Sequence, residues 1–189
     1  MPLKTETVER SVKRIGKVHL KALGKIARDD ISSLLSKSDR FRRAYRGRLF
    51  AITLCQGAAT HYLDGTNGVK DFDVWSWWAE RDPALSGYSG YKFPYRRFRS
   101  VDSARYDRCF EGFGVRANDA DDGYQGRRVD LLMREIPNSP AATGISDPVL
   151  ALQEYLTKRK TDSARLLSAK PVIGIWPESI LGIHIWAGT

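Results

Sequence analysis

The sequence predicts an α+β fold in which helices pack on a small mixed sheet. Residues 49–55 are an apolar run with the length of a strand, and residues 71–78 and 127–136 combine apolar with charged residues over a similar length. Apolar residues recur at helical spacing before the first run, and Asp147-Pro148 is a typical helix start further along the chain. A hydrophobic content of 42% over 189 residues is enough for one globular core.

The N-terminal segment is predicted to form amphipathic helices. Apolar residues recur every three or four positions over roughly residues 6–27. Asp29 and Asp30 have side chains that cap helices, which predicts a second helix beginning after them. Residues 40–48 are basic with interspersed aromatic residues, and we interpret them as a connection to the first strand.

The positive charge of the chain is concentrated in this N-terminal segment. Residues 1–50 contain 14 Lys and Arg against 5 Asp and Glu, and the rest contains 17 of each, so the net charge of +9 lies in the first quarter. We therefore divide the chain into a basic helical region, residues 1–47, and a core, residues 48–189. The basic region predicts contact with the phosphates of RNA or tRNA. The alternative is a solvated helix surface that keeps the protein soluble.

The centre of the predicted core is residues 48–78. A strand at residues 49–55 leads into a turn at residues 57–59, a short helix and a second strand. Asp71 and Asp73 are two residues apart in the second strand, so both carboxylates face the same side of the sheet. Like charges at this spacing repel each other, and a bound cation would remove that cost.

The later elements are less sharply defined by the sequence. Residues 82–95 are rich in Gly, Ser, Pro and Tyr and are predicted to form a loop. Residues 92–99 interleave cations with aromatic rings, which suits stacking on nucleic-acid bases and equally suits an edge strand. Residues 158–170 are predicted to continue the helix that starts at Pro148. The last apolar stretches, residues 172–176 and 180–186, fit either strands or packed loops.

Asp130 is the third carboxylate of the predicted site. Its neighbours Val129 and Leu131 are apolar, and an aspartate in such a strand is costly unless it faces water, a partner or a metal. If this strand lies beside the strand of Asp71 and Asp73, the three carboxylates converge. Such a cluster suits two Mg²⁺ or Mn²⁺ ions, which activate an attacking hydroxyl and stabilise a leaving pyrophosphate.

This arrangement resembles the nucleotidyltransferase superfamily typified by DNA polymerase beta. That family has a glycine turn, an Asp-x-Asp between hydrophobic residues and a later acidic residue on another strand. Gly57-Ala58, Asp71-Phe72-Asp73-Val74 and Val129-Asp130-Leu131 take those positions here, with twelve residues, 59–70, in the gap. The resemblance implies that Asp71, Asp73 and Asp130 bind the metals and carry catalysis. It also implies that the turn at Gly57 and Ala58 cradles the nucleotide phosphates.

The chain departs from the family pattern at two positions. The family often has Ser where this sequence has Ala58, and it prefers an apolar residue where this sequence has Gln56. Backbone N–H groups would still be able to hold phosphates at such a turn. Lys158 and Lys160 lie in a stretch similar to a family helix that carries cations near the nucleotide.

The resemblance implies transfer of a nucleoside monophosphate from an NTP to a hydroxyl, with release of pyrophosphate. RNA, tRNA, a protein and a small molecule are all compatible acceptors. Small members of the family often belong to bacterial defence or toxin–antitoxin systems, which is an analogy at the level of the fold. The alternative function is a catalytically silent nucleic-acid-binding or interaction module that kept the fold, and Ala58 supports it.

Several residues have a structural interpretation beside the functional one. The aspartates also fit solvated positions on an exposed strand. His61 is interpreted as a structural histidine before a phosphate contact, and the tryptophans at 75, 77 and 78 as core residues before a base-stacking platform. Cys55 is expected to be a buried small hydrophobe.

The sequence predicts a cytoplasmic protein without a membrane partner. It opens without a basic and then apolar leader, which is the pattern of a signal peptide. Its most apolar stretch, residues 171–186, is shorter than a bilayer-spanning helix and contains Pro177 and Glu178.

Overall fold

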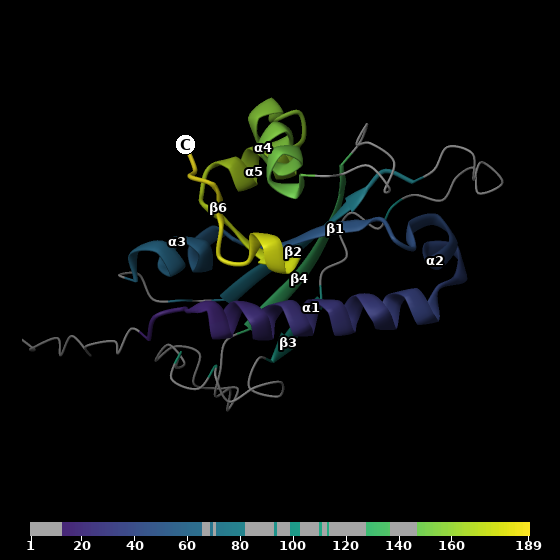
Figure 1. Ribbon diagram of the computed structural model, residues 1–189, viewed down its shortest axis with the longest axis horizontal. Coiled ribbons are helices and arrows are strands. Elements are labelled where there is room, and N and C mark those ends of the chain that lie inside the picture. Colours follow the sequence, from purple (N-terminus) through teal and green to yellow (C-terminus); the bar gives the residue numbers. More distant parts are fainter. Residues whose placement is uncertain are drawn as a thin grey trace, which may run out of the picture.

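A six-stranded sheet forms the centre of the molecule, with α1 on one face and α4 and α5 on the other (Figure 1). The computed structural model describes residues 13–65, 69, 71–81, 93, 99–102, 110, 113, 128–136 and 147–189. The strands are β1 (Leu49–Cys55), β2 (Asp71–Ala79), β3 (Arg99–Asp102), β4 (Arg128–Ile136), β5 (Val172–Trp176) and β6 (His184–Trp186). The helices are α1 (Lys17–Lys37), α2 (Asp39–Tyr45), α3 (Gln56–Asp64), α4 (Pro148–Lys158) and α5 (Asp162–Ser168), with the 3-10 helix η5 (Glu178–Ile180).

The sheet is mixed, and the predicted α+β class is confirmed. Its strand order is β3-β4-β2-β1-β5-β6. Among the described strands, β2 and β4 are the one parallel pair, and the other four pairings are antiparallel. The end of β1 therefore lies at the same edge of the sheet as the starts of β2 and β4.

The first face of the sheet is closed by α1. Apolar residues at helical spacing on α1, among them Leu20, Leu23 and Ile26, are fully or almost fully buried. They share one core with Phe72 of β2 and Val129 of β4. Since side chains alternate along a strand, this core takes every second residue of β2 and β4.

The second face is covered by α4 and α5. Trp75 and Trp77 on β2 pack in one core with residues of these helices, and the rings of Trp77 and Tyr155 lie 5.5 Å apart between centroids. The indole Nε1 of Trp77 donates to the hydroxyl of Thr53 at 2.8 Å. Trp78 packs in the first core, so all three tryptophans are buried and the core interpretation is confirmed.

Helix α1 corrects the prediction for the N-terminal segment. It is a single helix that runs through Asp29 and Asp30, so the predicted caps are wrong. The carboxylate of Asp29 pairs with Lys25 at 3.8 Å, and Asp30 is buried. The helix continues through Asp29 and Asp30, and does not end there, because the apolar stripe of α1 extends across these residues to Ile31. Residues 1–12 lie outside the described part of the chain.

The predicted connection at residues 40–48 is also corrected, because most of it is helix α2. The hydroxyl of Ser38 accepts from the backbone N–H of Phe41 at 3.2 Å and caps this helix. Phe41 and Tyr45 are buried, which gives the helix an apolar side against the core.

The C-terminal helix is divided in two, against the prediction for residues 158–170. Helix α4 begins as expected, since the Asp147 carboxylate accepts from the N–H of Val149 at 2.9 Å. It ends at Lys158, because Arg159 adopts a left-handed conformation with φ 45°. Thr161 then caps α5 by accepting from the N–H of Ala164 at 3.1 Å.

The two last apolar stretches contain strands, with β5 inside the sheet between β1 and β6. The predicted loop at residues 82–95 lies outside the described residues except for Phe93. Among the helices that the structure describes, none is long and apolar enough to cross a membrane.

Candidate active site

Two aspartates face each other across the parallel strands β2 and β4. The register places Asp73 opposite Asp130 and Asp71 opposite Arg128. Because aligned residues of neighbouring strands lie on one side of the sheet, all three aspartates occupy the same face. The register meets the condition set in the sequence analysis, that these two strands lie side by side.

The aspartates differ from their neighbours along the strands in which side of the sheet they face and in how exposed they are. Phe72 and Val129 are 0% exposed on the α1 side. On the opposite side Asp71 and Asp73 are half-buried and Asp130 is 7% exposed. A carboxylate as buried as that of Asp130 requires a polar or charged partner, and both Asp73 and Asp130 have one.

The donors at this edge are hard oxygen atoms, which suits Mg²⁺. Cys55 lies opposite Asp73 in the β1–β2 register, and its thiol is within 3.3 Å of the Thr53 hydroxyl. Burial raises the pKa of the Cys55 thiol far above its ordinary value, and the charge of Asp73 raises it further. Mg²⁺ prefers oxygen ligands, so the Cys55 sulfur is not a candidate ligand for it.

A complete set of protein ligands is not preformed in the described residues. They contain no group of three or more His, Cys, Asp or Glu side chains placed to hold a metal ion. Mg²⁺ usually takes one or two carboxylates and completes its coordination with water and substrate phosphates. Asp73 and Asp130, aligned across the two strands, fit that smaller requirement.

The start of helix α3 lies at the same edge as the aspartates. Cys55 is both the last residue of β1 and the N-cap of α3, and within the described residues no side chain caps this end. The first N–H groups of a helix and its dipole favour anions. A phosphate next to the carboxylates would therefore find donors here.

The predicted glycine turn is corrected at this point. Gly57, Ala58 and Ala59 all belong to α3, and the turn is made by Gln56 with φ 59°. No described atom lies within 4 Å of the place that a Cβ on Gly57 would occupy, so this side of the helix start is open. Ala58 is buried in the α1-side core, so only its backbone N–H can serve a ligand.

Lys158 and Lys160 are not brought to the aspartates by any described contact. Lys158 forms an exposed pair with Glu154 at 3.5 Å, and Lys160 is exposed between α4 and α5. Helix α4 is anchored near this end by Tyr155 on Trp77, which is four residues beyond Asp73 along β2. These four residues of strand place Trp77 about 13 Å from Asp73 along β2.

His61 is buried like a structural histidine, but only one of its ring nitrogens has a partner among the described residues, and Nδ1 is buried without one. It is 1% exposed, and its Nε2 lies 2.9 Å from the carbonyl oxygen of Lys13, which ties α3 to the segment before α1.

Two features of this edge were not predicted from the sequence: Arg128 and the left-handed conformation of Gln56. Arg128 is exposed, lies two residues before Asp130 and aligns with Asp71. Strand alternation alone would have placed it on the face of the aspartates.

Comparison of the chain with protein-family models, with curated proteins and with solved structures finds no match. The resemblance to nucleotidyltransferases therefore depends on the residue pattern.

Proposed function

We propose that the protein is a metal-dependent nucleotidyltransferase that moves a nucleoside monophosphate from an NTP to an acceptor hydroxyl. The observation that carries this proposal is the alignment of Asp73 with Asp130 on adjacent parallel strands. These strands begin at the edge of the sheet where α3 starts, so carboxylates and phosphate-binding N–H groups share one site.

Each part of the site has a distinct role in this proposal. Asp73 and Asp130, with Asp71 on the same face, would hold Mg²⁺, and a bound Mg²⁺ would supply neutralisation of the phosphate charge and activation of the hydroxyl. The N–H groups at the start of α3 donate to triphosphate oxygens. The acceptor oxygen bonds to the α-phosphorus, the bond from the α-phosphorus to the bridging oxygen breaks, and pyrophosphate leaves. Asp130 takes the proton of the hydroxyl.

Incubation of the purified chain with α-labelled NTPs, Mg²⁺ and total cellular RNA tests this function. Wild type is expected to transfer label to an acceptor, and Asp73→Asn and Asp130→Asn are expected to lose more than about 100-fold, since loss of residues that only orient metal ligands already costs 10–100-fold. Asp29→Asn is the matched control, because it removes the same charge from an exposed position on α1. Wild type that labels neither RNA nor itself with any NTP would overturn the proposal.

The second candidate is a nucleic-acid-binding module without catalysis. It is favoured by the lack of a preformed three-ligand metal group among the described residues and by Ala58 in place of a hydroxyl residue. In that case the wild type and the Asp73→Asn variant would bind RNA equally well, and neither would transfer label.

A further inference from the structure

A cluster of cations lies at the junction of α1 and α2. Lys37, Arg40, Arg43 and Arg46 repeat every three residues across the end of α1 and the whole of α2, and all four are exposed. Helix α2 buries Phe41, Ala44 and Tyr45 on its other side. We call these four exposed cations the α2 corner.

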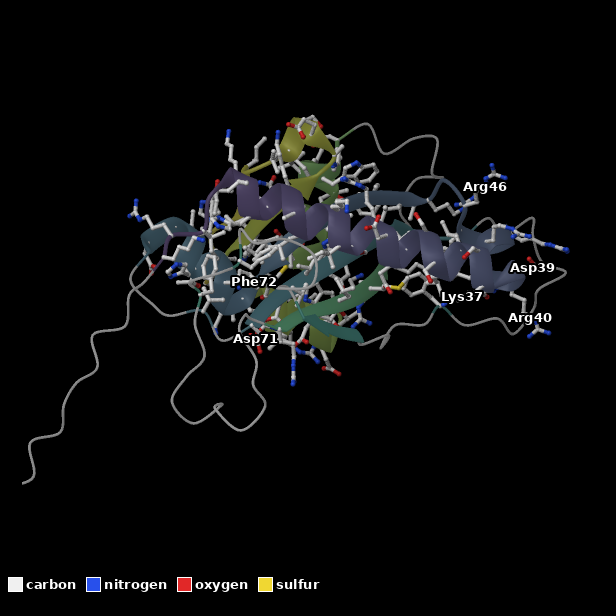
Figure 2. The ribbon with its side chains drawn as sticks, turned by 90° about the horizontal axis from the view of Figure 1, so that it is seen from below. Lys37, Asp39, Arg40, Arg46, Asp71 and Phe72 are labelled. Carbon is white, nitrogen blue, oxygen red and sulfur yellow. The ribbon has the colours of Figure 1, made fainter. Side chains whose placement is uncertain are left out.

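Three of the four cations of the α2 corner carry charge that no described acidic group neutralises, whereas two of the lysines on α1 are paired. Lys37, Arg40 and Arg46 form no ion pair within the described part of the chain, and the acid beside them, Asp39, pairs with Arg42 at 2.5 Å. On α1, by contrast, Lys21 pairs with Glu178 at 3.2 Å and Lys25 with Asp29 at 3.8 Å. Figure 2 shows Lys37, Arg40 and Arg46 together at one end of the molecule.

We propose that the α2 corner binds the phosphate backbone of a nucleic-acid acceptor, an inference that rests on the proposed function. Arginine presents a planar fork of donors that matches phosphate oxygens, and binding releases counterions from the nucleic acid. Phe41 and Tyr45 are at most 1% exposed, so α2 offers no ring for stacking on bases. Recognition at this corner is therefore of phosphates and independent of base sequence.

The α2 corner and the aspartates lie at opposite ends of β1. Arg46 precedes this strand by three residues, and the last residue of the strand, Cys55, is aligned with Asp73. Six residue steps of strand correspond to about 20 Å. An acceptor anchored at the corner therefore has to span at least the length of β1 to present a hydroxyl at the aspartates.

Fluorescence anisotropy in the absence of NTP tests the corner independently of catalysis. The triple variant Lys37→Gln, Arg40→Gln, Arg46→Gln is compared with a control, Lys17→Gln, Lys21→Gln, Lys25→Gln, which loses the same charge from exposed positions on α1. The probes are single-stranded 20-nucleotide RNA and DNA of one sequence. At about 0.7 per phosphate contact, the corner variant is expected to lose ~2 from the slope of log affinity against log salt.

The control variant is expected to keep the wild-type slope, and RNA and DNA are expected to bind alike because both offer phosphates. Equal losses in the two variants, or no loss in the corner variant, would overturn the proposal. Displacement of RNA by polyglutamate at equal charge would do so as well, because it would indicate a site for acidic proteins.

Transfer to acceptors of different length separates this inference from the proposed function. If wild type transfers label, the corner variant is expected to lose activity on a 20-nucleotide RNA and to keep it on a dinucleotide, which is too short to reach the corner. Equal loss on both lengths would overturn the proposed distance. If wild type transfers no label, the proposed function fails, and the anisotropy result alone decides whether the corner binds phosphates.

Discussion

The two faces of the β2–β4 pair differ most at the start of the strands. On the α1 side, Phe72, Val74 and Val129 are all 0% exposed and belong to one core. On the other side, the same stretch of strand carries Asp71, Asp73 and Asp130, and the apolar face begins only at Trp75.

This difference teaches which residues the fold requires. A continuous apolar face is explained by burial, whereas a carboxylate in the same strand loses solvation on folding and adds no apolar burial. Strand alternation thus places a residue that stabilises the fold next to one that burial does not explain. Substitutions at adjacent positions of β2 test this comparison directly.

The largest effect is expected at Phe72. Its ring lies 5.4 Å from both the Phe110 and Phe113 rings, between centroids, and it is fully buried. Phe72→Ala is expected to lower the free energy of unfolding by about 3–5 kcal/mol. The neighbouring variant Asp73→Ala is expected to change it by no more than about 1 kcal/mol. Urea denaturation of both proteins measures the difference, and equal losses would contradict the division between the faces.

The next effect concerns ligand binding at the aspartate face. A ligand at a hundredfold excess over its Kd stabilises the folded protein by about 2.7 kcal/mol. Mg²⁺ with a non-hydrolysable NTP analogue is therefore expected to raise the melting temperature of wild type by roughly 5–11 °C relative to EDTA. Asp73→Asn is expected to lose most of this shift, and Asp29→Asn to keep it. Shifts of the same size in all three proteins would show that the ligand binds elsewhere.

The strands were predictable from the sequence because their patterns are local. The boundaries of β1, β2 and β4 were predicted to within a residue, and Asp71 and Asp73 were placed on one face by alternation alone. The pairing of β2 with β4 was not predicted from the sequence. It was stated only as the condition under which the three carboxylates converge. Parallel neighbours are joined by long connections, so nothing local in either strand specifies its partner.

The helices show where local signals mislead. Asp29 and Asp30 have cap-forming side chains, but the apolar stripe of α1 continues past them and packing decides in its favour. Conversely, Ser38 and the apolar side chain of Phe41 mark α2 within a stretch whose arginines suggested a loop.

The smallest effect tests which residue makes the turn at the start of α3. Gln56 has φ 59°, a conformation that costs about 1–2 kcal/mol for a residue with a Cβ. Gln56→Gly removes this cost, but it also makes the unfolded chain more flexible. That flexibility lowers the free energy of unfolding by about 0.4–1 kcal/mol. We therefore expect a net stabilisation of roughly 0.5–1 kcal/mol.

The paired variant Gly57→Ala sharpens this last test. Gly57 lies in α3, and a Cβ there would meet no described atom within 4 Å, so alanine is expected to stabilise the protein by about 0.4–1 kcal/mol. If Gly57 made the turn in a left-handed conformation, Gly57→Ala would instead destabilise, and Gln56→Gly would gain nothing. The added methyl group also occupies the open side of the helix start, where the proposed triphosphate binds. Gly57→Ala should therefore raise the free energy of unfolding in urea and reduce the stabilisation by the NTP analogue. A purely structural role for this turn would not make these two quantities change in opposite directions.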